Sequence, residues 1–270
     1  RVRGELGFGV ESTAVQLAGR EAHGMAEAAR MVEANGARII DINMGCPAKK
    51  VTGGMSGSAL MKDLDLALAL IDAVVAAVRI PVTLKTRLGW DDECLNAAEL
   101  ARRAEAAGVA MITIHGRTRC QFYTGHADWS AIGAVKRTVG IPVVANGDIR
   151  TAPDAARALA ASGADGVMVG RGAQGAPWRL AEIAARTFGT PAPAIPAGSD
   201  FAAMVAGHYE DALAFYGAAL GARVIRKHLG WYMDAAGTPK PLRRAILTGD
   251  PATVLRLLPG ALAPARDLAA

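Results

Sequence analysis

The chain has 270 residues, of which 51% are hydrophobic and 20% are charged. This composition excludes a wholly disordered chain and supplies enough apolar side chains for a sizeable core. An uncharged apolar run long enough to cross a membrane does not occur, and the first residues lack the apolar segment of a signal peptide. The net charge of +5, from 30 basic and 25 acidic residues, permits a polyanionic partner without establishing one.

The three cysteines, Cys46, Cys94 and Cys120, are odd in number and widely spaced. They argue against a disulfide framework and favour a reducing, cytoplasmic environment. The sequence contains neither CxxC nor HExxH, so we expect no metal site.

Six short runs of β-branched and apolar residues alternate with alanine-rich segments. These runs are AVQLA at 14–18, RIIDIN at 38–43, VTLKT at 82–86, MITIH at 111–115, VVAN at 143–146 and GVMVG at 166–170. Continuous apolar runs are typical of strands in parallel sheets, and their spacing is close to the ~31 residues of one unit of a (β/α)8 barrel. We therefore expect an α/β fold of the TIM-barrel type, with six of its eight β/α units visible.

The segments between these runs predict helices. Apolar residues recur at helical spacing within residues 20–36, where Gly36 marks the expected end, and again within residues 64–78. Thr151 to Asp154 resembles a capping box ahead of another helix.

The sequence after the last predicted strand differs in texture. Three prolines fall within residues 188–199, which is typical of a semi-rigid linker, and helical patterns with aromatic residues follow. We expect a barrel over residues 1–190, a proline-rich linker over 191–199 and a small all-helical domain over 200–270.

Cys46 follows the second predicted strand on a turn made with Gly45 and Pro47. Strand ends of this kind carry the active sites of barrels, although free cysteines are commonly small buried residues. The glycine-rich loop 49–58 that follows is either a mobile lid or a plain solvated connection.

Three polar residues lie inside or at the end of predicted strands. Lys85 either meets a charged or electron-rich partner inside the barrel or extends outward to solvent. Gln16 either ties the core together or grips the edge of a ligand. His115 is either structural or functional, and its strand-end position raises the second possibility.

Glycine-containing turns end the last two predicted strands, Asn146-Gly147-Asp148 and Gly170-Arg171-Gly172. Barrels often bind phosphate with the loops after these two strands, and the alternative is a pair of ordinary tight turns. The first predicted strand is not followed by GxGxxG, which disfavours a Rossmann fold.

Basic residues concentrate in the tail, between positions 223 and 244. Six of them stand against one acid, Asp234, in this segment: Arg223, Arg226, Lys227, Lys240, Arg243 and Arg244. The first three share one helix face, and Trp231 falls one turn further on. Such a face suits an RNA backbone with an unstacked base, or it is an ordinary solvated surface.

Five motifs in order resemble the bacterial tRNA-dihydrouridine synthases, most of all their B-type subfamily. They are NMGCPAKKVTGGMSGSALM, LKTRLGW, TIHGRTRCQFY, VVANGDI and VMVGRG, and RKHLGWY resembles the C-terminal helical domain of that family. The resemblance covers nearly the whole chain.

The resemblance implies a barrel with bound FMN that uses NADPH to reduce uridines of tRNA to 5,6-dihydrouridine. It implies that reduced flavin delivers hydride to C6 and that Cys46 protonates C5, a role open to ordinary thiols because they are protonated at neutral pH. Lys85 would sit at the N1/O2 edge of the flavin, Gln16 would bond its polar edge, and His115 would contact it. The ribityl phosphate would be held by Asn146, Gly147, Asp148, Gly170 and Arg171.

The same resemblance implies the contacts to tRNA. Asn43 would orient the target base, which must leave its stack to reach the flavin. The remaining expected tRNA contacts are Lys49, Lys50, Arg223, Arg226, Lys227 and Trp231. We expect a monomer with no membrane partner.

One departure from the family is visible at the start of the chain. The Pro-Met-Ala-Gly-Val-Thr type strand that lies against the flavin and the strand after it are missing, and the chain begins with Arg1. We therefore expect an N-terminally truncated protein. Two other functions remain open, namely another FMN barrel of the dihydroorotate dehydrogenase type and an inactive tRNA-binding remnant.

Overall fold

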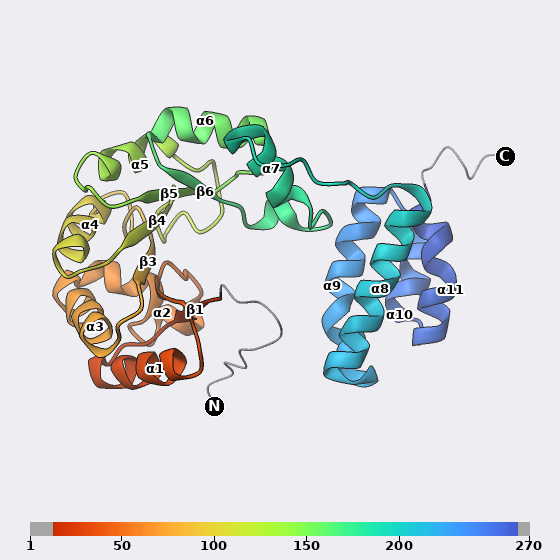
Figure 1. The fold of residues 1–270 in the computed structure, drawn as a ribbon, viewed down its shortest axis with the longest axis horizontal. Helices are drawn as coiled ribbons and strands as arrows, with labels where there is room; N and C mark the ends of the chain where they lie inside the picture. Colours follow the sequence, from red (N-terminus) through yellow and green to blue (C-terminus); the bar gives the residue numbers. More distant parts are fainter. Residues whose placement is uncertain (1–12, 264–270) are drawn as a thin grey trace. The chain divides into compact units, whose positions relative to one another are not determined.

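The computed structural model describes residues 13–263. Within them, six strands form one parallel sheet in chain order (Figure 1). The strands are β1 (Ala14–Leu17), β2 (Ile39–Met44), β3 (Val82–Arg87), β4 (Met111–His115), β5 (Val143–Asn146) and β6 (Gly166–Met168). Each lies within two residues of its predicted bounds, so the expected α/β fold with six visible units is confirmed. The expectation of truncation concerns the first residues, which lie outside the described ones.

Helices cover one face of this sheet, and Figure 1 shows them along the outside of its curve. They are α1 (Ala22–Ala34), α3 (Leu64–Ala77), α4 (Ala97–Ala106), α5 (Trp129–Lys136) and α6 (Ala152–Ser162). The buried apolar residues of the first four helices form one core with the strands, and Leu159 of α6 packs against it. Gly36 adopts a φ of 92° just beyond α1, a left-handed conformation that suits glycine and ends the helix as expected.

The strands alternate between an apolar and a polar face. In β2, Ile40, Ile42 and Met44 are buried towards the helices, whereas Asp41 and Asn43 lie on the opposite, inner face. The same alternation in β3 places Thr83, Lys85 and Arg87 on the inner face. The sheet therefore carries its polar side chains on the surface that a closed barrel would enclose.

The glycine-rich loop after β2 is not a plain solvated connection, and its alternative role as a mobile lid stays a prediction. It forms two short helices, α2 (Lys49–Thr52) and the 3-10 helix η1 (Gly57–Lys62). Most of η1 is buried, and it packs against β2. This segment is therefore part of the wall beside the strand ends.

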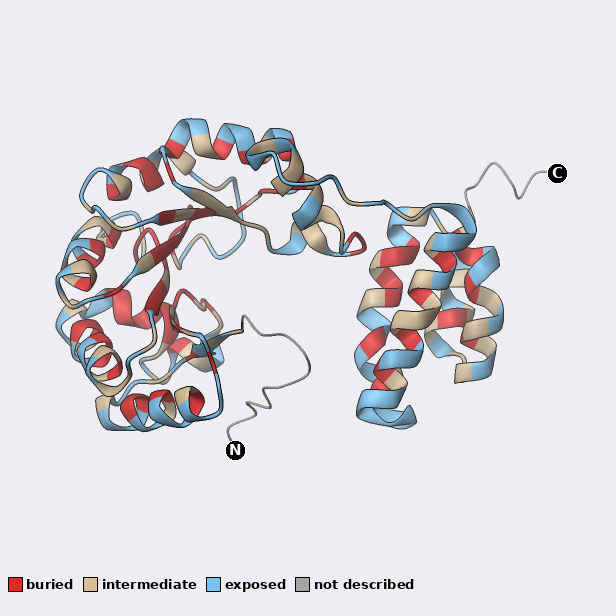
Figure 2. Cartoon of the chain, viewed as in Figure 1, coloured by how far each residue is buried: buried red, intermediate tan, exposed pale blue. Residues whose placement is uncertain are grey.

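The chain divides into two compact units, residues 1–149 with 153–169 and residues 150–152 with 170–270. The second unit contains the 3-10 helix η2 (Arg171–Ala173) and the helices α7 (Arg179–Phe188), α8 (Gly198–Tyr216), α9 (Ala218–Ala236), α10 (Lys240–Thr248) and α11 (Pro251–Leu262). It has its own apolar core, seen in Figure 2 as buried positions on the last four helices. Gly217, with a φ of 77°, separates α8 from α9 where the sequence suggests one continuous helical stretch.

None of the described helices is long and apolar enough to span a membrane.

Candidate active site

Strand register gathers several predicted residues at one end of the inner face. Lys85 of β3 is paired with Asn43 of β2 and with Thr113 of β4. His115 is paired with Arg87 on one side and with Asn146 on the other. Since the strands are parallel, these side chains share the carboxyl edge of the sheet, where barrel sites lie.

The Cys46 turn is held from two sides. The backbone N–H groups of Gly45 and Cys46 both donate to Asn43 Oδ1 at 3.0 Å. The Cys46 carbonyl accepts from the N–H of Ser58 at 3.1 Å and from its Oγ at 2.9 Å. Gly57 has a φ of 60°, and a Cβ there would come within 2.8 Å of the Cys46 carbonyl oxygen. The half-buried Cys46 thus sits on an ordered turn at the end of β2.

Asn43 and Gln16, both predicted to contact a ligand, also bond to each other. Asn43 Nδ2 donates to Gln16 Oε1 at 2.7 Å, and Gln16 Nε2 donates to Asp41 Oδ2 at 2.6 Å. Thr83 Oγ1 donates to the other Asp41 oxygen at 2.7 Å. Gln16 is nevertheless exposed on the inner face, so its contact with a ligand stays a prediction.

Lys85 presents a cation without a hydrogen-bond acceptor among residues 13–263. Burial lowers the pKa of its ammonium group, the neighbouring Arg87 lowers it further, and Asp41 acts in the opposite direction. A half-buried ammonium in this position favours an anionic or electron-rich ligand.

Arg87 was not singled out from the sequence. It is 2% exposed. Its guanidinium donates to the carbonyls of Gly45 at 2.8 Å and of Thr118 and Phe122, each at 2.9 Å. Arg87 therefore ties the Cys46 turn to the loop after β4, and its charge remains on the inner face because these partners are neutral.

His115 is buried and held neutral. Burial, together with the charges of Arg87, Lys85 and Arg117, lowers the pKa of its imidazole to about 3. Its Nδ1 is buried with no hydrogen-bond partner. A buried polar atom without a partner is costly, so this nitrogen favours a ligand group that the chain itself does not supply.

Asp148 binds a second buried arginine. Arg117, also 2% exposed, donates to Asp148 Oδ2 at 2.6 Å and to Oδ1 at 3.2 Å. Burial alone would raise the pKa of this carboxyl, but the hydrogen bonds from Arg117 and from the Ala127 N–H hold it below its ordinary value. An ion pair therefore shapes the predicted phosphate turn. The carboxylate of Asp148 is bound by Arg117 and does not itself face a phosphate group.

The rest of that turn packs closely against the chain itself. Gly147 and Asp148 have φ values of 113° and 56°. A Cβ on Gly147 would lie 2.7 Å from the Cβ of Ala127, so only glycine fits. Asn146 Nδ2 donates to the Met168 carbonyl of β6 at 2.8 Å, which ties the two strand ends together.

The other predicted residues lie elsewhere. Lys49 and Lys50 are exposed in α2, directly after the Cys46 turn. Gly170 and Arg171 belong to the second unit, and their part in a phosphate site stays a prediction.

In the tail, Arg223, Arg226 and Lys227 are all exposed on α9. Trp231 is half-buried, with its ring 5.0 Å from that of His228 in an edge contact. Arg243 donates to the Gly230 carbonyl at 2.8 Å and to Asp234 at 2.5 Å, so one of the six tail cations is neutralised within the tail.

Asp41, Arg87 and Arg117 are the residues that sequence reasoning missed. Each places a charge inside a strand or at a strand end, the same signal that singled out Lys85. Among residues 13–263, no cluster of three or more His, Cys, Asp or Glu side chains could hold a metal ion.

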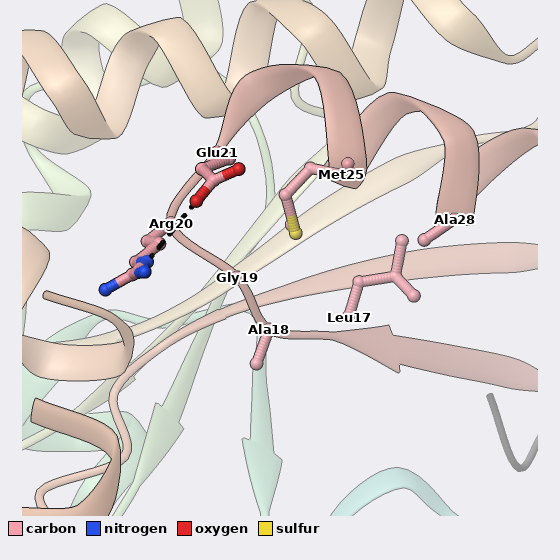
Figure 3. Close-up of a pocket in the computed structure, with 8 residues that line it drawn as sticks. Leu17, Ala18, Gly19, Arg20, Glu21, Met25 and Ala28 are labelled. Atoms are coloured by element: carbon pink, nitrogen blue, oxygen red, sulfur yellow. Dashed lines mark ion pairs between the residues drawn. The ribbon is translucent and has the colours of Figure 1, made fainter. Parts of the chain in front are cut away.

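A separate cavity of about 180 Å³ lies between the end of β1 and the start of α1 (Figure 3). Leu17, Met25 and Ala28 line it, and an ion pair of 3.5 Å joins Arg20 to Glu21 beside it. None of the predicted site residues lines this cavity.

Comparison with known proteins assigns the chain to a family. The model of the dihydrouridine synthase (Dus) family matches residues 8–253. A Rhodobacter capsulatus protein named "Probable tRNA-dihydrouridine synthase" is 64% identical over 96% of this chain and 79% of its own length. The "tRNA-dihydrouridine synthase B" of Xanthomonas axonopodis pv. citri is 49% identical over 81% of this chain and 66% of its own.

Among solved structures, a mandelate racemase/muconate lactonizing enzyme from Roseiflexus sp. aligns with a TM-score of 0.49 and 19% identity. That alignment covers 66% of this chain and 45% of the other. The family match and the identities to its members, over most of the chain, show that this protein belongs to the dihydrouridine synthase family.

Proposed function

We propose that this protein reduces specific uridines of tRNA to 5,6-dihydrouridine, with FMN bound on the inner face of the sheet and NADPH as the reductant. The observation that carries the proposal is the position of the Cys46 turn beside Lys85, at the joint carboxyl end of β2 and β3. An acid and a cation side by side at this edge suit protonation of a substrate next to an electron-rich ring.

The residues present fit a flavin. The ammonium group of Lys85 donates no hydrogen bond to any described residue, and the buried Nδ1 of His115 lacks a hydrogen-bond partner. Both are groups that a ring with polar edges satisfies. The turn at Gly147 and Asp148, at the end of β5, is the expected place of the phosphate.

The expected holders of the flavin ring are Gln16, Lys85 and His115. Those of its phosphate are Asn146, Gly147, Asp148, Gly170 and Arg171. Of this second group, Asp148 contributes by positioning, because Arg117 and the Ala127 N–H occupy its carboxylate oxygens.

When bound and reduced, FMN supplies the hydride for C6 of the uracil. Cys46 holds the proton for C5 on its sulfur, and the turn between Asn43 and Ser58 keeps that sulfur at the end of β2. The amide of Asn43, on the inner face next to Lys85, is proposed to orient the base. The buried guanidinium of Arg87 donates to the Gly45 carbonyl and helps to hold the turn that carries the thiol.

The tail is proposed to bind the tRNA body in the cytoplasm. Its support is the exposed basic face of α9, with Arg223, Arg226 and Lys227. Lys49 and Lys50 add exposed charge close to the Cys46 turn.

The test is the variant Cys46→Ala, assayed for dihydrouridine in tRNA. We expect a loss of about 10²- to 10⁴-fold, the usual contribution of a positioned acid. Flavin absorbance should stay at the wild-type level, because the thiol is proposed to act on the substrate alone.

The matched control is Cys120→Ala, which removes an exposed thiol outside the strand ends and should keep full activity. Wild-type activity in Cys46→Ala would overturn the role of the thiol. Wild-type protein that purifies without flavin and still binds tRNA would overturn the enzymatic function in favour of a binding remnant. Oxidation of dihydroorotate without reduction of tRNA would point to the other class of FMN barrel.

A further inference from the structure

The hydrogen bonds that hold Cys46 continue across β2 to a carboxylate that has no part in the proposed chemistry. From the turn inward they run from the Cys46 N–H to Asn43 Oδ1, from Asn43 Nδ2 to Gln16 Oε1, and from Gln16 Nε2 to Asp41 Oδ2. The three distances are 3.0, 2.7 and 2.6 Å. We call these four residues the Asp41 relay.

The direction of this relay is fixed by chemistry at both ends. A backbone N–H only donates, so the Asn43 atom that faces the turn must be its oxygen. Its nitrogen then faces Gln16, which must present its own oxygen, and the Gln16 nitrogen is left to donate to Asp41. An ionised carboxylate can only accept hydrogen bonds, so Asp41 allows a single orientation of the Gln16 amide, with its nitrogen towards Asp41.

We propose that Asp41 is a positioning residue that sets the orientation of the Gln16 and Asn43 amides and thereby holds the turn that displays Cys46. Asp41 lies two residues before Asn43 on the same face of β2, so it acts through Gln16 of β1 and not by touching the turn. Thr83 of β3 donates to its second oxygen at 2.7 Å, on the side of the carboxylate away from Gln16.

The consequence is that the side-chain amides of Gln16 and Asn43 are each restricted to one of their two flipped orientations. Without an acceptor at position 41, the exposed Gln16 amide can flip, and its nitrogen then faces Asn43 Nδ2 as donor against donor. Asn43 would lose one partner or release the Gly45 and Cys46 N–H groups. The inference rests on the proposed role of Cys46, and its test is chosen to need no turnover.

Two measurements report the turn directly. One is the rate of Cys46 alkylation by iodoacetamide, followed by mass spectrometry with the exposed Cys120 of the same sample as internal reference. The other is hydrogen exchange of a peptide covering residues 43–47. In Asp41→Ala we expect both rates to rise about two- to tenfold, the range that loss of one hydrogen bond produces.

Two control variants separate the relay from general damage. Asp41→Asn should stay near wild type, because its amide oxygen still accepts from Gln16 while its nitrogen can donate to Thr83 Oγ1. Thr83→Val removes the bond on the far side of Asp41 and should leave both rates at the turn unchanged.

A double-mutant cycle makes the test decisive. In a Gln16→Met background the relay is already broken, so adding Asp41→Ala should change neither rate further. An unchanged turn in Asp41→Ala, or a full additional effect in the Gln16→Met background, would overturn the proposal. If Asp41→Ala does not fold, Gln16→Met alone tests it, since an unchanged turn after loss of the exposed Gln16 amide contradicts the relay. None of these outcomes depends on whether Cys46 proves to be the acid.

Discussion

Positive charge dominates the residues around His115. Lys85, Arg87 and Arg117 all lower the pKa of its imidazole, and only Asp148 acts in the opposite direction. A carboxylate bound by one arginine does not balance three cations. The inner face therefore carries an excess of positive charge at the strand ends, which suits an anionic ring or phosphate and disfavours a cationic ligand.

His115 makes the stability of the fold depend on pH in a defined direction. Its pKa is about 3 in the folded chain, against about 6.5 when unfolded, so below pH 6.5 only the unfolded chain takes up the proton. We expect this group to cost about 2 kcal/mol of unfolding free energy as the pH falls from 6.5 to 5. Urea unfolding at a series of pH values measures it.

The variant His115→Gln serves as the comparison, because it keeps a polar side chain of similar size that does not titrate. Its stability at neutral pH will differ through packing, but its curve should be flatter than that of the wild type below pH 6.5. Curves that run parallel would show that His115 takes up its proton equally in both states.

At the scale of the elements, the strands were predictable and the loops between them were not. The β-branched runs located β1 to β6 to within two residues, because a strand that packs on helices is rich in β-branched and apolar residues, even where every second position is polar. The burial of η1 carried no such pattern, since it depends on the Cys46 carbonyl meeting Ser58, 12 residues later.

The site shows the same division. Lys85 and His115 stood out as polar residues in apolar runs. Arg87 and Arg117 did not, because their partners include the loop carbonyls of Thr118 and Phe122 and of Thr124 and Gly125, which no local pattern reveals. Backbone acceptors have no sequence signature, so the burial and the partners of these arginines become apparent only in the structure, although a charge at a strand end is itself a signal.

Gly57 offers a test of the segment that supports Cys46. Gly57→Ala would place a Cβ in a left-handed conformation and within 2.8 Å of the Cys46 carbonyl oxygen. We expect a loss of about 1–3 kcal/mol in unfolding free energy, the range for a strained non-glycine residue, measured by urea denaturation. Gly54→Ala is the matched control, because its nearest contact would be an ordinary 3.6 Å. Equal stability of the two variants would show that η1 shifts to accommodate the added Cβ without a cost in unfolding free energy.

At the scale of the whole molecule, the two units have separate apolar cores. Substitutions on the surface of one should therefore leave the packing of the other intact. This separation allows the tail to be tested for tRNA binding in the full chain, without disturbing the strand ends.

The double variant Arg226→Ala/Lys227→Ala removes two exposed cations of α9. If they contact phosphates, tRNA affinity should fall and the slope of log affinity against log salt should become shallower by about 1 to 2. Titrations at several salt concentrations measure the slope. Arg30→Ala, at an exposed position of α1, is the control with no expected change in slope. An unaltered slope in the double variant would assign the α9 face to solvent.

The alternation along β3 has a consequence for how this gene can vary. Site residues and core residues alternate along this strand. Thr83, Lys85 and Arg87 lie on the inner face, and Val82, Leu84 and Thr86 lie on the face towards the helices. Loss or gain of a single codon before Lys85 would exchange the two sets, sending the cations towards the helices and the leucine into the site. Point substitutions can be absorbed one at a time, but a frame-preserving deletion here would abolish both the fold and the reaction. We expect length changes among descendants of this sequence to be confined to its loops.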